Sequence, residues 1–148
     1  MPGYGIARST DGLLPWSWAL QRLRDSHRYW VATRDPGGAP HLAAVWGVWV
    51  DDALHFSTGG QSRKARNLAG DPRCSIAPDG ASESVVLVGE AVRVTARTAV
   101  AAVREVYVSK YGEGFPSPAE NPLYGVHPTS VIGIDEASFT SSATRWRF

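Results

Sequence analysis

The chain has 148 residues, of which 43% are hydrophobic, and a formal net charge of +1 at neutral pH. This composition predicts one globular domain with a real core, and the small net charge predicts binding neither to nucleic acid nor to an acidic membrane surface. No apolar run approaches the roughly 20 residues of a membrane-spanning helix, and residues 1–13 do not resemble a secretion signal. The single cysteine, Cys74, permits no disulfide within the chain, which fits a reducing cytoplasm.

Most of the predicted elements are strands. Short apolar or alternating runs, separated by turn residues, predict strands at 28–34, 41–50, 54–58, 73–77, 84–95, 129–135 and 138–148, the last two as a hairpin. The segment 41–50 is apolar on both faces, so we expect both faces to be covered. Asp51 and Asp52 mark a tight antiparallel hairpin between this strand and the next, and Gly89 marks a bulge.

Apolar residues at helical spacing predict helices at 15–26, 62–69 and 97–111. Residues 1–13 form an irregular lead-in, and residues 112–128, with four prolines and three glycines, form a long loop of the kind that often serves as a lid or a subunit contact. A barrel would remove the edges that so many strands would otherwise expose. The sequence therefore predicts a mainly β fold, a small antiparallel β-barrel with short helices over residues 14–148.

One continuous segment has the features of a phosphate site. An apolar strand ends in two hydroxyl residues, a Gly-Gly turn lets the backbone come close to a ligand, and a serine then opens a helix with two basic residues in its first turn. The polar residues of the segment are Ser57, Thr58, Ser62, Arg63, Lys64 and Asn67. The spacing is not that of a Walker A loop. A strand, a turn and a solvated basic helix would explain the same residues, so both interpretations stay open at this point.

In their order and spacing, several segments resemble the pyridoxamine 5′-phosphate oxidase-like split β-barrel family. The segments are Ala32–Thr33, Gly38–His41, Val45–Val50, Phe56–Thr58, Ser62–Leu68, Asp71–Arg73, Val85–Val94 and Thr144–Phe148. The last of them is similar to the ending of the branch that uses a deazaflavin. The resemblance covers roughly residues 14–148. It implies a homodimer of split barrels, with a flavin or deazaflavin in a groove between the subunits.

The resemblance also implies roles for individual residues. Ser57 and Thr58 match positions at the cofactor phosphate and ribityl chain, and Arg63 and Lys64 match basic phosphate contacts. Ser62 matches the hydroxyl that opens the helix, and Asn67 lies in the same block. The backbone of Ala43, Ala44, Val45 and Trp46 matches the strand along the ring system, and Arg145 and Trp146 match a C-terminal strand that reaches the groove from the same or the other subunit.

Two departures from the family bear on the cofactor. Flavin-using oxidases carry basic residues where this chain has Leu42 and Gly47, and their C-terminal substrate-binding arginine and histidine have no counterpart before Phe148. Both departures favour coenzyme F420, a 5-deazaflavin, over FMN. The implied activity is an F420-dependent oxidoreductase that transfers hydride between the deazaflavin and a small conjugated substrate. The alternatives are an FMN-binding oxidase-like protein and a non-catalytic flavin or haem carrier.

No catalytic residue is assigned by the sequence. Hydride transfer takes its reactivity from the cofactor, and no Ser/His/Asp constellation is present. The weak candidates for a proton donor are His127 and Tyr124, both in the predicted loop. The four histidines lack metal-ligand spacing, so we expect no metal site.

Overall fold

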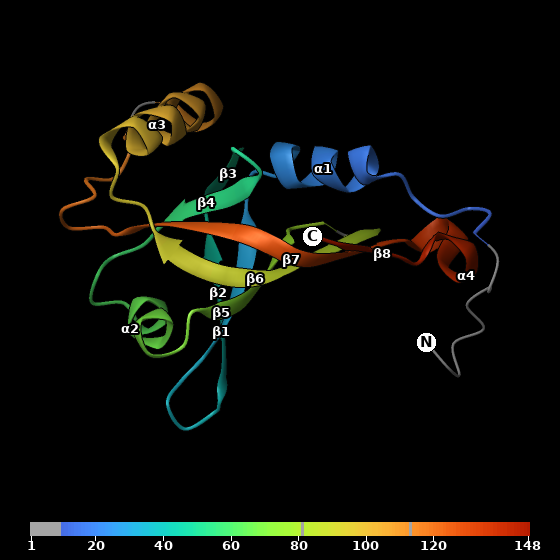
Figure 1. The fold of residues 1–148 in the computed structure, drawn as a ribbon, viewed down its shortest axis with the longest axis horizontal. Coiled ribbons are helices and arrows are strands. Elements are labelled where there is room, and N and C mark those ends of the chain that lie inside the picture. The colour runs from blue at the N-terminus through green and yellow to red at the C-terminus, as the bar shows by residue number, and fades with distance from the viewer. Residues whose placement is uncertain (1–9, 81, 113) are drawn as a thin grey trace.

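The computed structural model describes residues 10–80, 82–112 and 114–148, so most of the predicted lead-in, residues 1–9, lies outside the described residues. The described part is a mainly antiparallel sheet that curls into a half-barrel, as predicted, with a few short helices around it. In Figure 1, α1 and α3 lie above the sheet and α2 lies below it.

Eight strands are found in the described residues, all paired antiparallel. They are β1 (Tyr29–Arg34), β2 (Pro40–Val45), β3 (Gly47–Val50), β4 (Ala53–Ser57), β5 (Arg73–Pro78), β6 (Glu83–Arg93), β7 (Leu123–Asp135) and β8 (Thr144–Arg147). Their order across the sheet is β2-β1-β5-β6-β7-β4-β3, and β8 adds to β7.

The three predicted helices are present at almost the expected places. They are α1 (Trp16–Asp25), α2 (Arg63–Gly70) and α3 (Arg97–Tyr111), followed near the C-terminus by a 3₁₀ turn (Glu136–Ser138) and α4 (Phe139–Ser142). Two predicted boundaries are wrong. The loop expected at 112–128 ends at 122, because the residues from Leu123 onward pair with β4 and are buried. The last strand begins only at Thr144, because the residues after β7 wind into helical turns.

The predicted strand 41–50 is not continuous. It breaks at Trp46 into β2, which pairs with β1, and β3, which pairs with β4. The two halves are the two edge strands of the sheet, so the chain itself joins one edge to the other. Both faces were expected to be covered, but Leu42 is 61% exposed and Trp46 is 49% exposed in this single chain.

Gly47, directly after the break, is held from several sides. A Cβ atom at this position would lie 3.1 Å from the His55 carbonyl oxygen and 3.2 Å from the Tyr29 ring. Its N–H donates to the Tyr111 hydroxyl (3.0 Å), and its carbonyl accepts from the Lys110 ammonium (3.0 Å). Lys110 also donates to the hydroxyl of Tyr29. Helix α3 therefore fixes the point where the sheet turns back on itself.

The core fills the inside of the curled sheet. Buried residues of the strands meet α1 there, where Ala19 and Leu23 are inaccessible to solvent. A second, smaller cluster joins Val103 and Tyr107 of α3 to Val48 and Leu123. Burial of this kind stabilises a fold by about 25 cal/mol per Å² of apolar surface, so the two clusters hold α1 and α3 onto the sheet.

The predicted bulge lies where β6 faces β7. The register between these strands shifts between Val88 and Gly89. A Cβ atom on Gly89 would lie only 2.3 Å from the carbonyl oxygen of His127, so this position requires glycine.

We therefore predict that Gly89→Ala lowers the free energy of unfolding by about 1–3 kcal/mol, the usual effect of overpacking. Urea unfolding followed by tryptophan fluorescence measures it. Gly70→Ala is the matched control, because a Cβ atom there meets nothing within 4 Å. A Gly89→Ala variant as stable as the wild type would show that the two strands separate at little cost.

His55 of β4 is 7% exposed, and its Nδ1 has no hydrogen-bond partner in the described part of the chain. Burial lowers the pKa of His55 below its usual value of 6.5, and His127 nearby lowers it further. The folded protein thus holds this imidazole neutral at a pH where the unfolded chain takes up a proton.

The consequence is a loss of stability in acid. As the pH falls below about 6.5, unfolding binds a proton, and the free energy of unfolding falls by up to about 1.4 kcal/mol per pH unit. We expect His55→Leu to reduce this slope in urea titrations between about pH 7.5 and about pH 5.5. At about pH 8 His55 is neutral in the folded and in the unfolded state. The difference in free energy of unfolding between the two proteins at that pH therefore reports the change in packing alone. Equal slopes in the two proteins would contradict the prediction.

Candidate functional site

The segment with phosphate-site features folds as a strand end, a turn and a capped helix. The Ser62 Oγ accepts a hydrogen bond from the Ala65 N–H (3.2 Å) and so caps α2, as serine at this position is expected to do. The Thr58 and Ser62 hydroxyls lie 3.1 Å apart. They hold two protons and need only one for the bond between them, so one proton remains to donate to an anion.

The Ser57 hydroxyl, unlike the Thr58–Ser62 pair, donates to the backbone of the chain. It donates to the carbonyl oxygens of Asn121 (2.9 Å) and Pro122 (3.3 Å), in the loop before β7. The Gly60 N–H donates to Glu120 in the same loop. The Ser57 proton is therefore occupied within the chain, and contact with a phosphate would require this bond to break.

The two basic residues at the start of α2 have different surroundings. Arg63 donates to Asp35 (3.1 Å), in the turn between β1 and β2. The pKa of Asp35 is lowered, first by the Ala39 N–H and then by Arg63. Lys64 is half-buried and has no hydrogen bond or ion pair with any described residue, and burial lowers its pKa. Lys64 is thus a partly desolvated cation beside the unpaired N–H groups that begin any helix.

Asn67 fastens α2 to the sheet. It is 4% exposed, and its side-chain nitrogen donates to the Thr33 hydroxyl of β1 (3.0 Å). That hydroxyl lies 3.5 Å from Nδ1 of His41 on β2. Asn67 therefore has a structural role in this chain, and it places the basic start of α2 beside the beginning of β2.

The segment expected along the ring system follows on β2. Its first residue, Ala43, comes two residues after His41, which is about 7 Å along the strand. Ala44 is exposed and Val45 is buried. Trp46 stacks on Tyr111 of α3 with ring centroids 4.9 Å apart. Because β2 is an edge strand, the backbone groups on its outer side have no neighbouring strand among the described residues.

The outer face of the sheet beside β2 is apolar and open. Leu42, Ala32, Ser75 and Val88 form one row across four strands, and Ala44, Trp30 and Ala77 form the next. Paired residues of an antiparallel sheet share a face. Leu42 is 61% exposed, and Trp30 and Val88 are more than a third exposed. We call these seven residues the outer patch.

The structure does not bring the C-terminal pair to this place within one chain. Arg145 pairs with Ile132 on β7, whereas Ser57 pairs with Leu123 at the start of the same strand. Nine residues separate those positions, about 30 Å of extended chain. Trp146 packs against Trp16 of α1, with ring centroids 5.6 Å apart.

The two candidate proton donors also lie apart from each other. His127 is exposed on β7. Tyr124 is 6% exposed and stacks on Phe56, with its hydroxyl end in a separate cavity beyond α2. Among the described residues, no group of three His, Cys, Asp or Glu side chains could hold a metal ion, and no helix is long and apolar enough to cross a membrane.

Sequence reasoning missed the residues that position the site from a distance. Asp35 was assigned only to a turn, and Thr33, Lys110 and Tyr111 were given no part in positioning the site. The contacts of Asp35, Thr33 and Lys110 join residues 28 to 81 positions apart in the chain. No local pattern signals such contacts.

Comparison with known proteins decides the family. The family model described as Pyridoxamine 5′-phosphate oxidase matches residues 19–139. The chain belongs to this family. No curated protein sequence matches it significantly.

Several solved structures share the fold at low identity. A conserved hypothetical protein, Rv2991 from Mycobacterium tuberculosis, is 22% identical with a TM-score of 0.72, covering 88% of this chain and 90% of its own. A heme binding protein from Mycobacterium smegmatis is 19% identical with a TM-score of 0.68, covering 87% of this chain. This chain spans only 57% of that protein. An F420 reductase is 21% identical with a TM-score of 0.61, covering 80% of this chain and 98% of its own.

The donors present suit the phosphate end of a flavin-type cofactor. Lys64 lacks a partner in the described residues, Arg63 keeps donors beyond the one used by Asp35, and one hydroxyl proton of the Thr58–Ser62 pair is free. Charge-assisted bonds from such groups are strong. For a ring along β2, the described residues of one chain offer an edge strand and an open apolar face but no opposite wall.

Proposed function

We propose that the protein is an F420-dependent oxidoreductase that transfers hydride between the deazaflavin and a small conjugated organic molecule. The observation that carries the proposal is Lys64, a partly buried cation with no partner in the described residues, at the start of a helix beside an open apolar strand. A group in this position suits an anionic ligand that also presents a flat ring. The similarity to an F420 reductase supports the choice of deazaflavin.

In this proposal the chain binds the cofactor, orients it and shields the reacting atoms from water. Arg63, Lys64 and the Thr58–Ser62 hydroxyl pair hold the phosphate. The backbone of Ala43–Trp46 lies along the ring. When bound, the cofactor supplies the hydride chemistry itself. The protein has to hold the reacting atoms close together and exclude water, which are the larger parts of such catalysis.

The proposal includes a homodimer. The outer patch would be covered by a second copy, which would also supply the missing wall of the groove. Arg145 and Trp146 would then reach the cofactor of the partner subunit, since they lie about 30 Å along β7 from Ser57 in their own chain. A contiguous open apolar area on a monomer is the usual mark of such an interface.

A carrier of haem or FMN is the competing candidate. Two similar structures are described as a heme binding protein from Mycobacterium smegmatis and a heme storage protein, HutZ, from Vibrio cholerae. His41 lies beside the proposed site on β2, so a nitrogen ligand is within reach of this groove. A comparison of the affinities for F420, FMN and haemin separates the two functions.

We predict that the purified protein binds F420 more tightly than FMN or haemin in parallel fluorescence titrations, and that Lys64→Ala weakens F420 binding by about 1.5–3 kcal/mol, the contribution of a hydrogen bond to a charged group. Arg66→Ala is the matched control, because it removes a positive charge from the same helix at a different angle. Tightest binding of haemin would replace the oxidoreductase by the carrier, and unchanged F420 affinity would remove Lys64 from the site.

The dimer has its own test. Leu42→Glu places a charge in the outer patch, so we expect it to shift the protein from dimer to monomer in analytical ultracentrifugation, because burying an unpaired carboxylate is costly. Val108→Glu on α3 is the control, since Val108 is also 40% exposed but lies outside the patch. A monomeric wild type, or a Leu42→Glu variant that stays dimeric, would contradict the prediction.

A further inference from the structure

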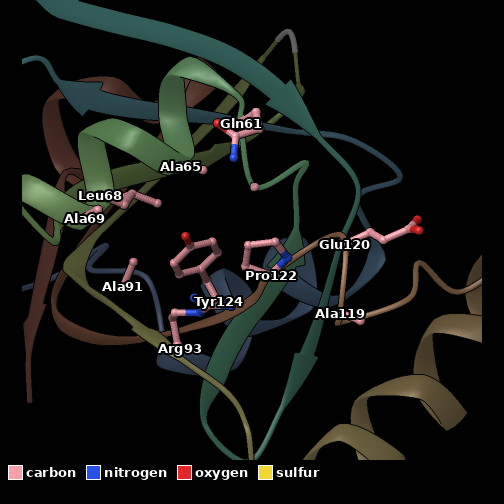
Figure 2. A pocket seen from close by; sticks show the side chains of 11 residues that line it. Gln61, Ala65, Leu68, Ala69, Ala91, Arg93, Ala119, Glu120, Pro122 and Tyr124 are labelled. Carbon is pink, nitrogen blue, oxygen red and sulfur yellow. The ribbon is translucent and has the colours of Figure 1, made fainter.

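A second cavity borders α2 on the side of Ala65, Leu68 and Ala69. Its volume is about 560 Å³, within the range of small-molecule sites. Figure 2 shows it between α2, the end of β6, the start of β7 and the loop before β7. Its lining residues are Gly60, Gln61, Ala65, Leu68, Ala69, Ala91, Arg93, Ala119, Glu120, Pro122 and Tyr124.

Helix geometry separates this cavity from the proposed cofactor site. Ala65, Leu68 and Ala69 line the cavity and share one face of α2, since they are spaced three and four residues apart. Arg63 and Asn67, four residues apart, lie on another face, where Arg63 bonds to Asp35 and Asn67 bonds to Thr33 of β1. Lys64, four residues before Leu68, lies between the two faces and does not line the cavity. A ligand in the cavity would thus meet the apolar side chains of the helix.

None of the polar side chains that line the cavity has a hydrogen bond or ion pair within the described residues, and Tyr124 and Arg93 are the two that lie together on the sheet. The Tyr124 side chain is 6% exposed, and its hydroxyl makes no hydrogen bond there, whereas the hydroxyls of Tyr29 and Tyr111 are both bonded within the chain. The hydroxyl oxygen is not itself fully buried, so it is open to a ligand in the cavity. In Figure 2 this hydroxyl points toward α2, and the nitrogen of the Gln61 side chain points down toward the cavity.

Arg93 is the second such group. It pairs with Tyr124 in the sheet register, so both side chains lie on the same face. Arg93 is exposed and has no ion pair in the described part of the chain, so its guanidinium is available to a ligand. Among the described residues that line the cavity it is the only cation, and the carboxylate of Glu120, the only anion among them, points away from Arg93 and Tyr124 in Figure 2.

We propose that this cavity binds a small organic carboxylate with a flat apolar body and a hydroxyl at the end opposite the carboxylate. The Arg93 guanidinium would take the carboxylate in a two-point bond, which its planar fork favours. The Tyr124 hydroxyl and the Gln61 amide would bond to the far hydroxyl. The alanines, Leu68 and Pro122 would bury the carbon body. The inference does not rest on the cofactor, because no residue proposed to hold the cofactor lines this cavity.

The test uses the purified full chain without added cofactor and para-hydroxybenzoate as the probe, followed by calorimetry and ligand-observed NMR. We expect saturable binding, and weaker binding of para-hydroxybenzyl alcohol, which lacks the carboxylate. Arg93→Gln should lower the affinity for para-hydroxybenzoate about tenfold, the effect of losing a charge-assisted bond. Arg104→Gln on α3 is the matched control and should leave the affinity unchanged.

Tyr124→Phe provides the second arm and keeps the ring that packs on Phe56. It should weaken binding of para-hydroxybenzoate but not of benzoate, because only the former has a hydroxyl to lose. This comparison decides the question even if Arg93→Gln fails to fold, which its urea unfolding curve would reveal. Absence of saturable binding, equal binding of the acid and the alcohol by the wild type, or affinities unaffected by both substitutions would overturn the proposal, and none of these outcomes bears on F420 binding.

Discussion

The shape of the sheet depends on the hydrogen bonds between α3 and the backbone of Gly47. Because the chain passes directly from one sheet edge to the other at Trp46, the curl exists only if this point is fixed. Lys110 and Tyr111 fix it through the two backbone groups of Gly47, and the Tyr29 ring leaves no room there for a side chain. Burial lowers the pKa of Lys110 to about 8, and its ammonium still makes three hydrogen bonds across the joint. The same joint sets where the Ala43–Trp46 backbone lies, so the proposed ring site inherits its geometry from α3.

Helix α2 organises the opposite end of the half-barrel. It is only eight residues long, so propensity alone would not hold it in water. The Ser62 cap, the bond from Asn67 to Thr33 and the burial of Leu68 fix it in place. Fixing the helix directs Arg63 toward the turn between β1 and β2 and an apolar face toward β6 and β7. One short element thus borders both the proposed phosphate site and the second cavity.

The described residues of a single chain leave an apolar surface open and the proposed site residues apart. The outer patch stays open to water beside an unpaired edge strand, and the C-terminal pair lies far along β7 from the basic start of α2. The proposed second copy across the patch would account for both features. Residues 19–139 establish the family. The proposed dimer is the step that leads from the family to a cofactor groove.

The sequence by itself determined the features that depend on neighbouring residues. These include the Ser62 cap of α2, the Asp51–Asp52 hairpin, the Gly89 bulge and the clustering of polar groups in Ser57–Asn67, because turn chemistry and capping act over a few positions. Tertiary structure alone decided the break at Trp46, since a run of apolar residues has the same pattern whether it serves one strand or two. It also decided the pairing of Arg63 with Asp35, the structural use of Ser57 and Asn67, and the cavity at Arg93 and Tyr124. Those contacts depend on the register between distant strands, which only the packed sheet fixes.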